Sequence, residues 1–184
     1  MKKGILLICL LSFVVAGLQA QGRYFTKTAR IVFLSHAPLE TIEAVNKTAG
    51  AVLDTRTGAV QAVALMRGFD FKKALMQEHF NENYVESDKF PKAEFRGTLV
   101  NNENINYGKD GTYTTTAKGQ LTIHGVTKPL EAPVTLSVQN GKINVTTAFT
   151  VSLSDYQISI PSIVKDKVSK SVKATLDAML DPLN

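Results

Sequence analysis

Residues 113–153 read YTTTAKGQLTIHGVTKPLEAPVTLSVQNGKINVTTAFTVSL and alternate apolar and polar residues through three strand-length runs. Turn signals at Gly125 and at Asn140-Gly141 separate these runs. A period of two means that one face of each strand is buried and the other faces water. Long antiparallel strands with one wet face form either a sandwich or a closed barrel. The stretch therefore predicts an all-β fold of one of these two kinds.

The rest of the chain adds five strands and one helix to this pattern. Residues 71–84 change to helical spacing, which predicts a single helical insertion between strands 3 and 4. Strands of about 12 residues are about 40 Å long at about 3.3 Å per residue, longer than a sandwich of this size needs. We therefore predict an extended eight-stranded antiparallel β-barrel. Its strands are expected over residues 23–34, 41–53, 59–71, 93–99, 113–123, 130–138, 143–153 and 164–180.

Small residues share the inward parity of these strands with larger neighbours. An eight-stranded barrel has an interior that side chains can fill, or that can hold one slender ligand. Two interpretations stay open: the small residues leave room in the lumen, or they accommodate bulky partners across the barrel. The residues concerned are Ala62, Ala64, Ala117, Gly119, Ala132, Ala174 and Ala178.

The N-terminus has the pattern of a secretory signal peptide. Lys2 and Lys3 precede the apolar run 5–15, and small residues lead to a cleavage site after Ala20. The apolar run is shorter than the roughly 20 residues of a membrane span, although a retained anchor is the alternative. We expect residues 1–20 to be a signal peptide and residues 21–184 to form one barrel domain. The expected location is the periplasm or the outside of the cell.

Charge and cysteine content exclude several classes of partner. Removal of Lys2 and Lys3 lowers the formal net charge from +5 to +3, because no acidic residue is lost with them. The remaining charges are scattered, so no nucleic-acid partner is expected. Cys9 is the only cysteine and falls within the predicted signal, which leaves the mature chain without a disulfide or a thiolate site. No membrane span is expected after cleavage, and a homodimer is left open.

The residues that carry chemistry are few and isolated. His79 and Glu82 are one helical turn apart, but two ligands make a weak metal site. No phosphate-binding loop or nucleophile elbow is present. We therefore expect no enzyme activity, no catalytic residue, no metal and no cofactor; an enzyme using Lys170 or His79 is the alternative. Asp166 and Lys170 interrupt the apolar face of the last predicted strand. Lys170 is expected to contact the polar end of a ligand, to pair with Asp166 or Glu43, or to turn outward at a bulge.

Three motifs carry a resemblance to a known family. Residues 121–128, LTIHGVTK, resemble the signature hairpin of the YceI-like family of exported bacterial proteins. Residues 75–95 resemble the helix and the following strand of one branch of that family, and residues 153–158 match as well. The resemblance spans essentially the whole mature chain. It implies an extended, lipocalin-like barrel that holds a polyisoprenoid chain or an isoprenoid quinone-like molecule in its lumen.

The pattern and the resemblance together predict an exported protein that sequesters or carries a long apolar isoprenoid-type lipid. The helical insertion is expected to act as a lid whose apolar face completes a tunnel. The alternative is a barrel without a ligand that acts as a stress-response or protein-interaction module. The predicted ligand contacts in the lumen and lid are Phe71, Leu75, Phe80, Phe95, Ala117, Leu121, Ile123, Val134, Leu136, Phe149, Val151, Lys170, Val172 and Leu176.

Overall fold

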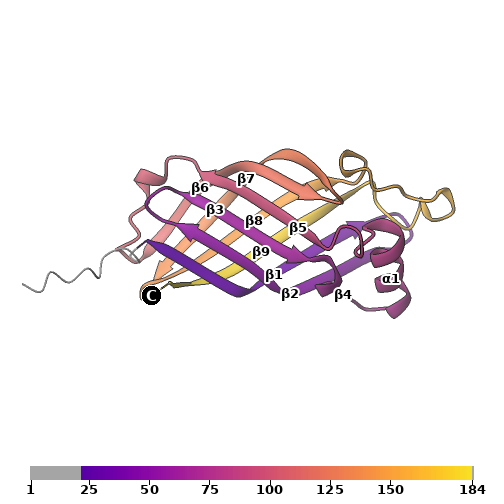
Figure 1. Cartoon of the computed structure of the whole chain (residues 1–184), viewed down its shortest axis with the longest axis horizontal. Helices are drawn as coiled ribbons and strands as arrows, with labels where there is room; N and C mark the ends of the chain where they lie inside the picture. Colours follow the sequence, from indigo (N-terminus) through magenta and orange to yellow (C-terminus); the bar gives the residue numbers. More distant parts are fainter. Residues whose placement is uncertain (1–21, 184) are drawn as a thin grey trace, which may run out of the picture.

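The computed structural model describes residues 22–183, so the predicted signal peptide lies outside the described residues. Eight long antiparallel strands form a closed barrel, in which each strand pairs with its neighbours in the sequence and β1 pairs with both β2 and β9 (Figure 1). The predicted all-β barrel is therefore confirmed. The long strands are β1 (Arg23–His36), β2 (Thr41–Asp54), β3 (Ala59–Leu65), β5 (Lys92–Leu99), β6 (Gly111–Ile123), β7 (Val126–Gln139), β8 (Lys142–Ser152) and β9 (Ser171–Pro182).

The helical insertion lies between the third and fourth long strands, as predicted. It consists of a 3-10 turn (η1, Met66–Gly68), a two-residue strand (β4, Asp70–Phe71) paired with β2, a short helix (α1, Ala74–His79) and a π-helical turn (η2, Phe80–Tyr84). The predicted strand 59–71 thus ends early, at Leu65. Its carbonyl oxygen accepts a hydrogen bond from the buried side chain of Asn46 at 3.0 Å, and the chain turns away from the sheet there.

The start of the last strand was predicted wrongly. β9 begins at Ser171, and residues 153–170 form a connecting segment with two 3-10 turns, η4 (Ser154–Tyr156) and η5 (Ser162–Val164). Within this segment Val168 donates a backbone hydrogen bond to Val164 at 3.1 Å, as in a helical turn. The charges of Asp166 and Lys170 therefore do not interrupt an apolar strand face, because they precede the strand.

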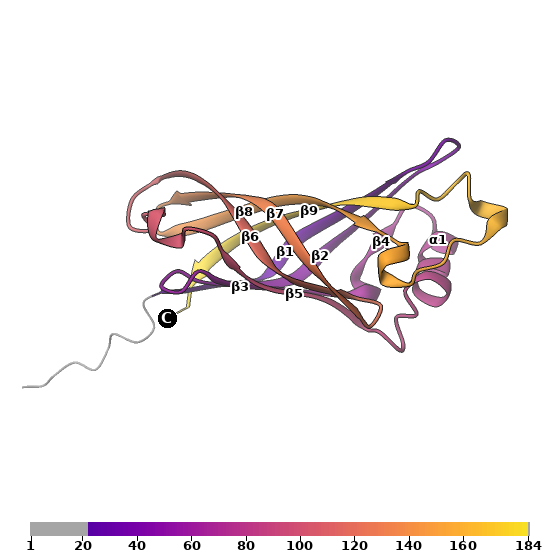
Figure 2. The same ribbon diagram turned by 90° about the horizontal axis from the view of Figure 1, so that it is seen from above.

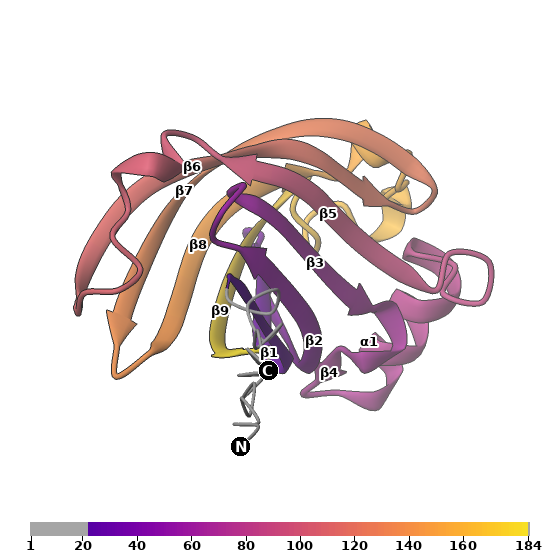
Figure 3. The same cartoon turned by 60° about the vertical axis from the view of Figure 1, so that its left-hand side comes forward.

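The barrel has two different ends (Figures 1 and 2). One end carries the turns after β2 and β7 together with the C-terminus, and we call it the termini end. The other carries α1, the turn between β1 and β2, and the 153–170 segment, and we call it the helix end. Figure 3 shows the strands wrapping round a common interior, with α1 at the far end. The two ends differ in what fills them.

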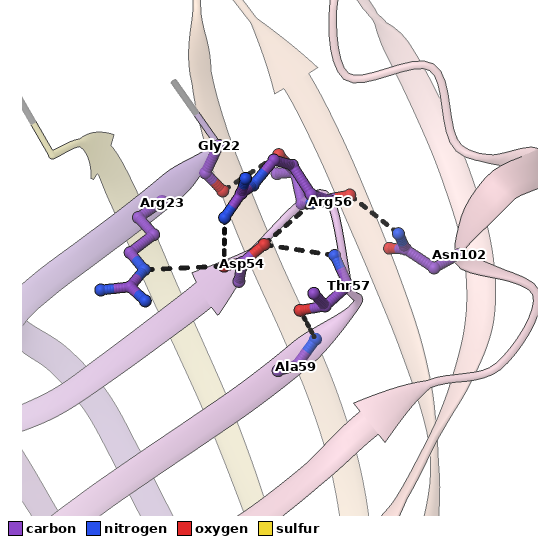
Figure 4. A network of polar contacts seen from close by, with 8 residues as sticks. Gly22, Arg23, Asp54, Arg56, Thr57, Ala59 and Asn102 are labelled. Carbon is purple, nitrogen blue, oxygen red and sulfur yellow. Dashed lines mark hydrogen bonds and ion pairs between the residues drawn. The ribbon is translucent and has the colours of Figure 1, made fainter. Parts of the chain in front are cut away.

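Buried aliphatic side chains fill the termini end. Leu53, Leu136, Ile143 and Leu180 are all almost completely buried there, in one continuous cluster. Turn contacts outside this cluster fix the strand ends, as Figure 4 shows for Asp54, which accepts backbone hydrogen bonds from Arg56 and Thr57. Burial raises the pKa of Asp54, but these hydrogen bonds and the Arg56 charge outweigh burial and lower it below its ordinary value. The carboxylate therefore stays charged and holds the turn.

Strands β5 and β6 approach each other unusually closely where Gly97 pairs with Gly119. A Cβ atom added at Gly119 would lie under 3.0 Å from the backbone of both Arg96 and Gly97. The ring of Phe95 covers Gly97 in place of a side chain. The sheet thus requires glycine at these two positions because of backbone contact.

Strand β7 pairs with β8 only from Val134 to Gln139. Its first half contains Pro129 and Pro133, which have no backbone N–H to donate to a neighbouring strand. The η4 turn packs against β7 and β8 at this place. The side of the barrel at the helix end is therefore completed by a loop and not by strand pairing.

Candidate functional site

The barrel interior contains a cavity of about 520 Å³ lined almost entirely by apolar side chains. This volume lies in the range of small-molecule binding sites, about 300–1,000 Å³. Strand β8 and the residue after it contribute every inward residue from Val145 to Leu153, a distance of about 26 Å at about 3.3 Å per residue. The cavity is therefore long as well as apolar.

The cavity begins at the helix end and reaches the buried side chains of the termini end. Its deepest lining residues include Leu53, Leu99 and Leu180. At the level of Leu180, Val138 and Ile143 are buried in the cluster that fills the termini end, and neither lines the cavity. The interior is thus a blind tunnel with its mouth beside α1 and the 153–170 segment.

The structure brings together twelve of the fourteen residues predicted as ligand contacts. They come from the insertion and from strands β5 to β9, which shows that strand parity was assigned correctly over most of the barrel. The twelve that line the cavity are Phe71, Leu75, Phe80, Phe95, Ala117, Leu121, Ile123, Val134, Phe149, Val151, Val172 and Leu176.

Two of the predicted contacts do not line the cavity. Leu136 faces inward and is completely buried in the hydrophobic cluster, although its paired neighbour Val145 lines the cavity. Lys170 is exposed and lies in the 153–170 segment, one residue before β9. The inward parity predicted for Leu136 is therefore correct, although its side chain does not line the cavity, whereas Lys170 was wrongly assigned to a strand.

The small residues explain why the interior is not filled. Six of the seven inward small residues line the cavity, which supports the interpretation that they leave room in the lumen: Ala62, Ala64, Ala117, Ala132, Ala174 and Ala178. Gly119 is the exception, because it serves the close approach of β5 and β6.

An aromatic cluster forms the cavity wall below α1. The ring centroid of Phe33 lies 5.4 Å from that of Phe69, 5.6 Å from that of Phe71 and 5.4 Å from that of Phe80. Such tilted contacts are favourable for aromatic pairs and hold the insertion on β1. Sequence reasoning missed Phe33 as a site residue, although the same alternation with Ile31 and Ser35 places it inward.

Polar side chains gather at the cavity mouth, and the sequence did not reveal them. Lys73 precedes α1, and its Nζ lies 2.8 Å from Oε1 of Glu40 in the β1–β2 turn. His79 and Lys167 also line the cavity near this opening. Their common location depends on three segments far apart in the sequence, so no local motif could have indicated it.

Tyr84 is a further cavity residue in the π-helical turn. The turn is closed by a hydrogen bond from the backbone N–H of Val85 to the carbonyl oxygen of Phe80 at 3.0 Å. Burial raises the pKa of the Tyr84 hydroxyl, which therefore stays neutral at physiological pH. Tyr84 therefore adds a neutral hydroxyl group to the cavity wall.

His124 connects the parts that cover the helix end. Its Nε2 lies 2.8 Å from Oε2 of Glu86, just after η2, and its Nδ1 lies 3.1 Å from the carbonyl oxygen of Tyr156 in η4. Both partners are acceptors, so a ring that carries a proton on each nitrogen donates to both. The backbone at His124 is left-handed, with φ of 51°. His124 lies in the turn between β6 and β7, and its ring joins this hairpin to both covering segments.

Replacing His124 with alanine is expected to lower the free energy of unfolding by about 2 kcal/mol, because two hydrogen bonds are lost and alanine tolerates a positive φ poorly. Urea unfolding measures this change. His124→Asn separates the two causes. Asparagine adopts the left-handed region readily but is too short to reach both partners, so its effect on stability reports the lost hydrogen bonds alone. An alanine variant as stable as the wild type would contradict a bridging role.

Within residues 22–183, no three acidic or histidine side chains gather in a way that could hold a metal ion. In the same part of the chain, every helix is too short or too polar to cross a membrane. A second hollow of about 400 Å³ lies beside the start of β6 and is lined mainly by Asn and Thr side chains, whereas the barrel cavity is the apolar one.

Comparison with known proteins gives a consistent result. The model of the YceI-like domain matches residues 24–180. A solved polyisoprenoid binding domain from Saccharophagus degradans, implicated in plant cell wall breakdown, has a TM-score of 0.77 at 12% identity, with 88% of this chain and 99% of that chain covered. Burkholderia cenocepacia BcnA has a TM-score of 0.68 at 15% identity, with 83% and 95% covered. For a Campylobacter jejuni YceI protein the values are 0.54, 16%, 73% and 81%. No curated protein sequence matches the chain.

Proposed function

Because the chain belongs to the YceI-like domain family, we propose that it binds a long apolar isoprenoid-type lipid, a polyisoprenoid or a quinone-like molecule, in its barrel lumen. The observation that carries this proposal is the blind apolar tunnel of about 520 Å³. Apolar surface removed from water contributes about 25 cal/mol per Å² to binding, and a slender chain in a long tunnel buries nearly all of its surface. The polyisoprenoid binding domain with the same fold supports this ligand class.

The twelve predicted contacts that line the cavity are the proposed ligand-binding residues, together with Phe33 and Tyr84. The apolar tail would lie along β6 to β9, toward Leu99 and Leu180. The polar end would lie at the mouth, beside the Glu40–Lys73 pair and Lys167. The proposed role is sequestration or transport rather than catalysis. The expected signal peptide supports a location in the periplasm or outside the cell.

The first test of the proposal is to identify what the protein carries. The protein lacking residues 1–20 is purified from its native host without detergent, extracted with organic solvent and examined by mass spectrometry. We expect an isoprenoid-type lipid at up to one molecule per protein. Delipidated protein is then titrated with a polyprenol delivered from detergent, and saturable uptake is expected. Neither co-purified lipid nor uptake would contradict the proposal and would favour a barrel that acts as an interaction module.

A further inference from the structure

The three most exposed large apolar side chains of the described residues all lie at the helix end. Ile163 is 90% exposed, Leu39 is 71% exposed and Leu75 is 60% exposed. They belong to three separate segments: η5, the β1–β2 turn and α1. Single exposed apolar residues are ordinary on protein surfaces, whereas several gathered around one opening indicate an interaction site.

Direct contacts join these three segments into one rim. The backbone N–H of Leu39 donates to the carbonyl oxygen of Asp166 at 3.0 Å, which connects the β1–β2 turn to the 153–170 segment. The neighbouring Glu40 pairs with Lys73 at 2.8 Å, which connects the same turn to the start of α1. Figure 2 shows the β1–β2 turn, the 153–170 segment and α1 projecting from the same end of the barrel.

The rim is continuous with the cavity. Leu75 is exposed and also lines the cavity, and Val164, next to Ile163, lines it as well. An apolar path therefore runs from the outer surface of the rim into the tunnel. A lipid entering along this path stays in contact with apolar side chains throughout.

Charges next to the rim suit the headgroup region of a bilayer. Lys165 and Lys167 follow Ile163 and are exposed on either side of Asp166. Lysines beside apolar residues that enter a membrane surface strengthen binding to anionic lipids. The rim carboxylate of Glu40 is already paired with Lys73. Lys165 is the charge closest to Ile163 in the sequence, and the two lysines together outnumber Asp166 between them.

We infer that the rim formed by Leu39, Leu75 and Ile163 is a docking surface for a phospholipid bilayer, which places the cavity mouth against the membrane during loading. The inference rests on the proposed function, because a long isoprenoid has almost no population in water and is collected from a membrane. Leu39 and Ile163 enter the boundary between headgroups and acyl chains, and Lys165 and Lys167 contact phosphates. The mouth then opens directly onto lipid.

The test is co-sedimentation of the protein lacking residues 1–20 with sucrose-loaded vesicles that contain no isoprenoid. Vesicles of phosphatidylcholine are compared with vesicles that also contain phosphatidylglycerol. We expect the wild-type protein to bind both, and the anionic vesicles more strongly. The double variant Leu39→Ser/Ile163→Ser is expected to bind at least ten-fold more weakly to both. Neither of these two side chains lines the cavity.

Met179→Ser/Leu183→Ser is the matched control, since both residues are exposed and apolar but lie away from the rim. It is expected to bind vesicles like the wild type. Wild-type protein that fails to bind either vesicle, or a rim variant that binds as well as the control, would overturn the docking inference.

Uptake of polyprenol from detergent separates the docking inference from the proposed function. We expect the rim variant to keep this uptake and to lose most uptake from vesicles. If the wild-type protein takes up polyprenol from detergent but does not bind vesicles, the docking inference is refuted and the lipid-binding function is not. Vesicle binding without any uptake would refute the lipid-binding function instead.

Discussion

Ala117→Phe is expected to reduce polyprenol uptake at least ten-fold, about 1.4 kcal/mol of binding free energy, while the barrel stays folded. Ala117 lies on β6 opposite Leu99 and Ala132 and lines the cavity. A phenyl group at this position would occupy the space that an extended lipid needs. Because the cavity is open there, the extra volume costs less than it would in a filled core.

The measurement is a titration of delipidated protein with a fluorescent polyene isoprenoid, with far-UV circular dichroism as the check on folding. Ala148→Phe is the matched control, because Ala148 lies on β8 between the inward residues Thr147 and Phe149 and does not line the cavity. The control should bind like the wild type. Full uptake by folded Ala117→Phe protein would mean that the lipid does not lie in the lumen.

Gly119→Ala is expected to destabilise the protein by about 3 kcal/mol or more, a loss at the upper end of single-site effects. The added Cβ would overlap the backbone of Arg96 and Gly97, and neither strand can move without breaking the β5–β6 pairing. A flexible side chain could yield to such an overlap, but backbone atoms of a paired strand cannot.

Gly50→Ala provides the comparison for this effect. Gly50 is also a strand glycine, but an added Cβ would meet only the carbonyl oxygen of Thr26, at an ordinary distance of 3.8 Å. We expect its stability to be unchanged or raised by about 0.5 kcal/mol, because alanine restricts the unfolded chain more than glycine does. Urea unfolding of both variants measures the two free energies of unfolding. Equal values would show that the close approach of β5 and β6 does not require glycine at position 119.

The sequence predicted the barrel wall well because alternation is a local property that the closed sheet preserves. Val134 and Phe149 were assigned inward from parity alone, and both line the cavity. Leu136 shares that parity, yet it is completely buried among other side chains and does not line the cavity. Parity tells which face of a strand points inward and carries no information about whether neighbouring side chains cover an inward residue.

The mouth was predicted less well because it is assembled from loops. Lys170 was placed on a strand because valines continue the alternation before it. In the structure, residues 153–170 form turns, and β9 begins only at Ser171. The Glu40–Lys73 pair joins residues whose proximity depends on the closed barrel. The bridge from His124 to Glu86 and Tyr156 depends on it in the same way. Such contacts become visible only once the tertiary structure is known.

The filled termini end has a consequence for how any cargo is exchanged. Since Val138 and Ile143 close the tunnel floor, the interior communicates with its surroundings at one end. A bound lipid would then enter and leave through the same cavity mouth, so the protein cannot contact a donor and an acceptor of the lipid at the same time. Under the proposed function, the protein therefore has to leave a donor before it can deliver its lipid to an acceptor.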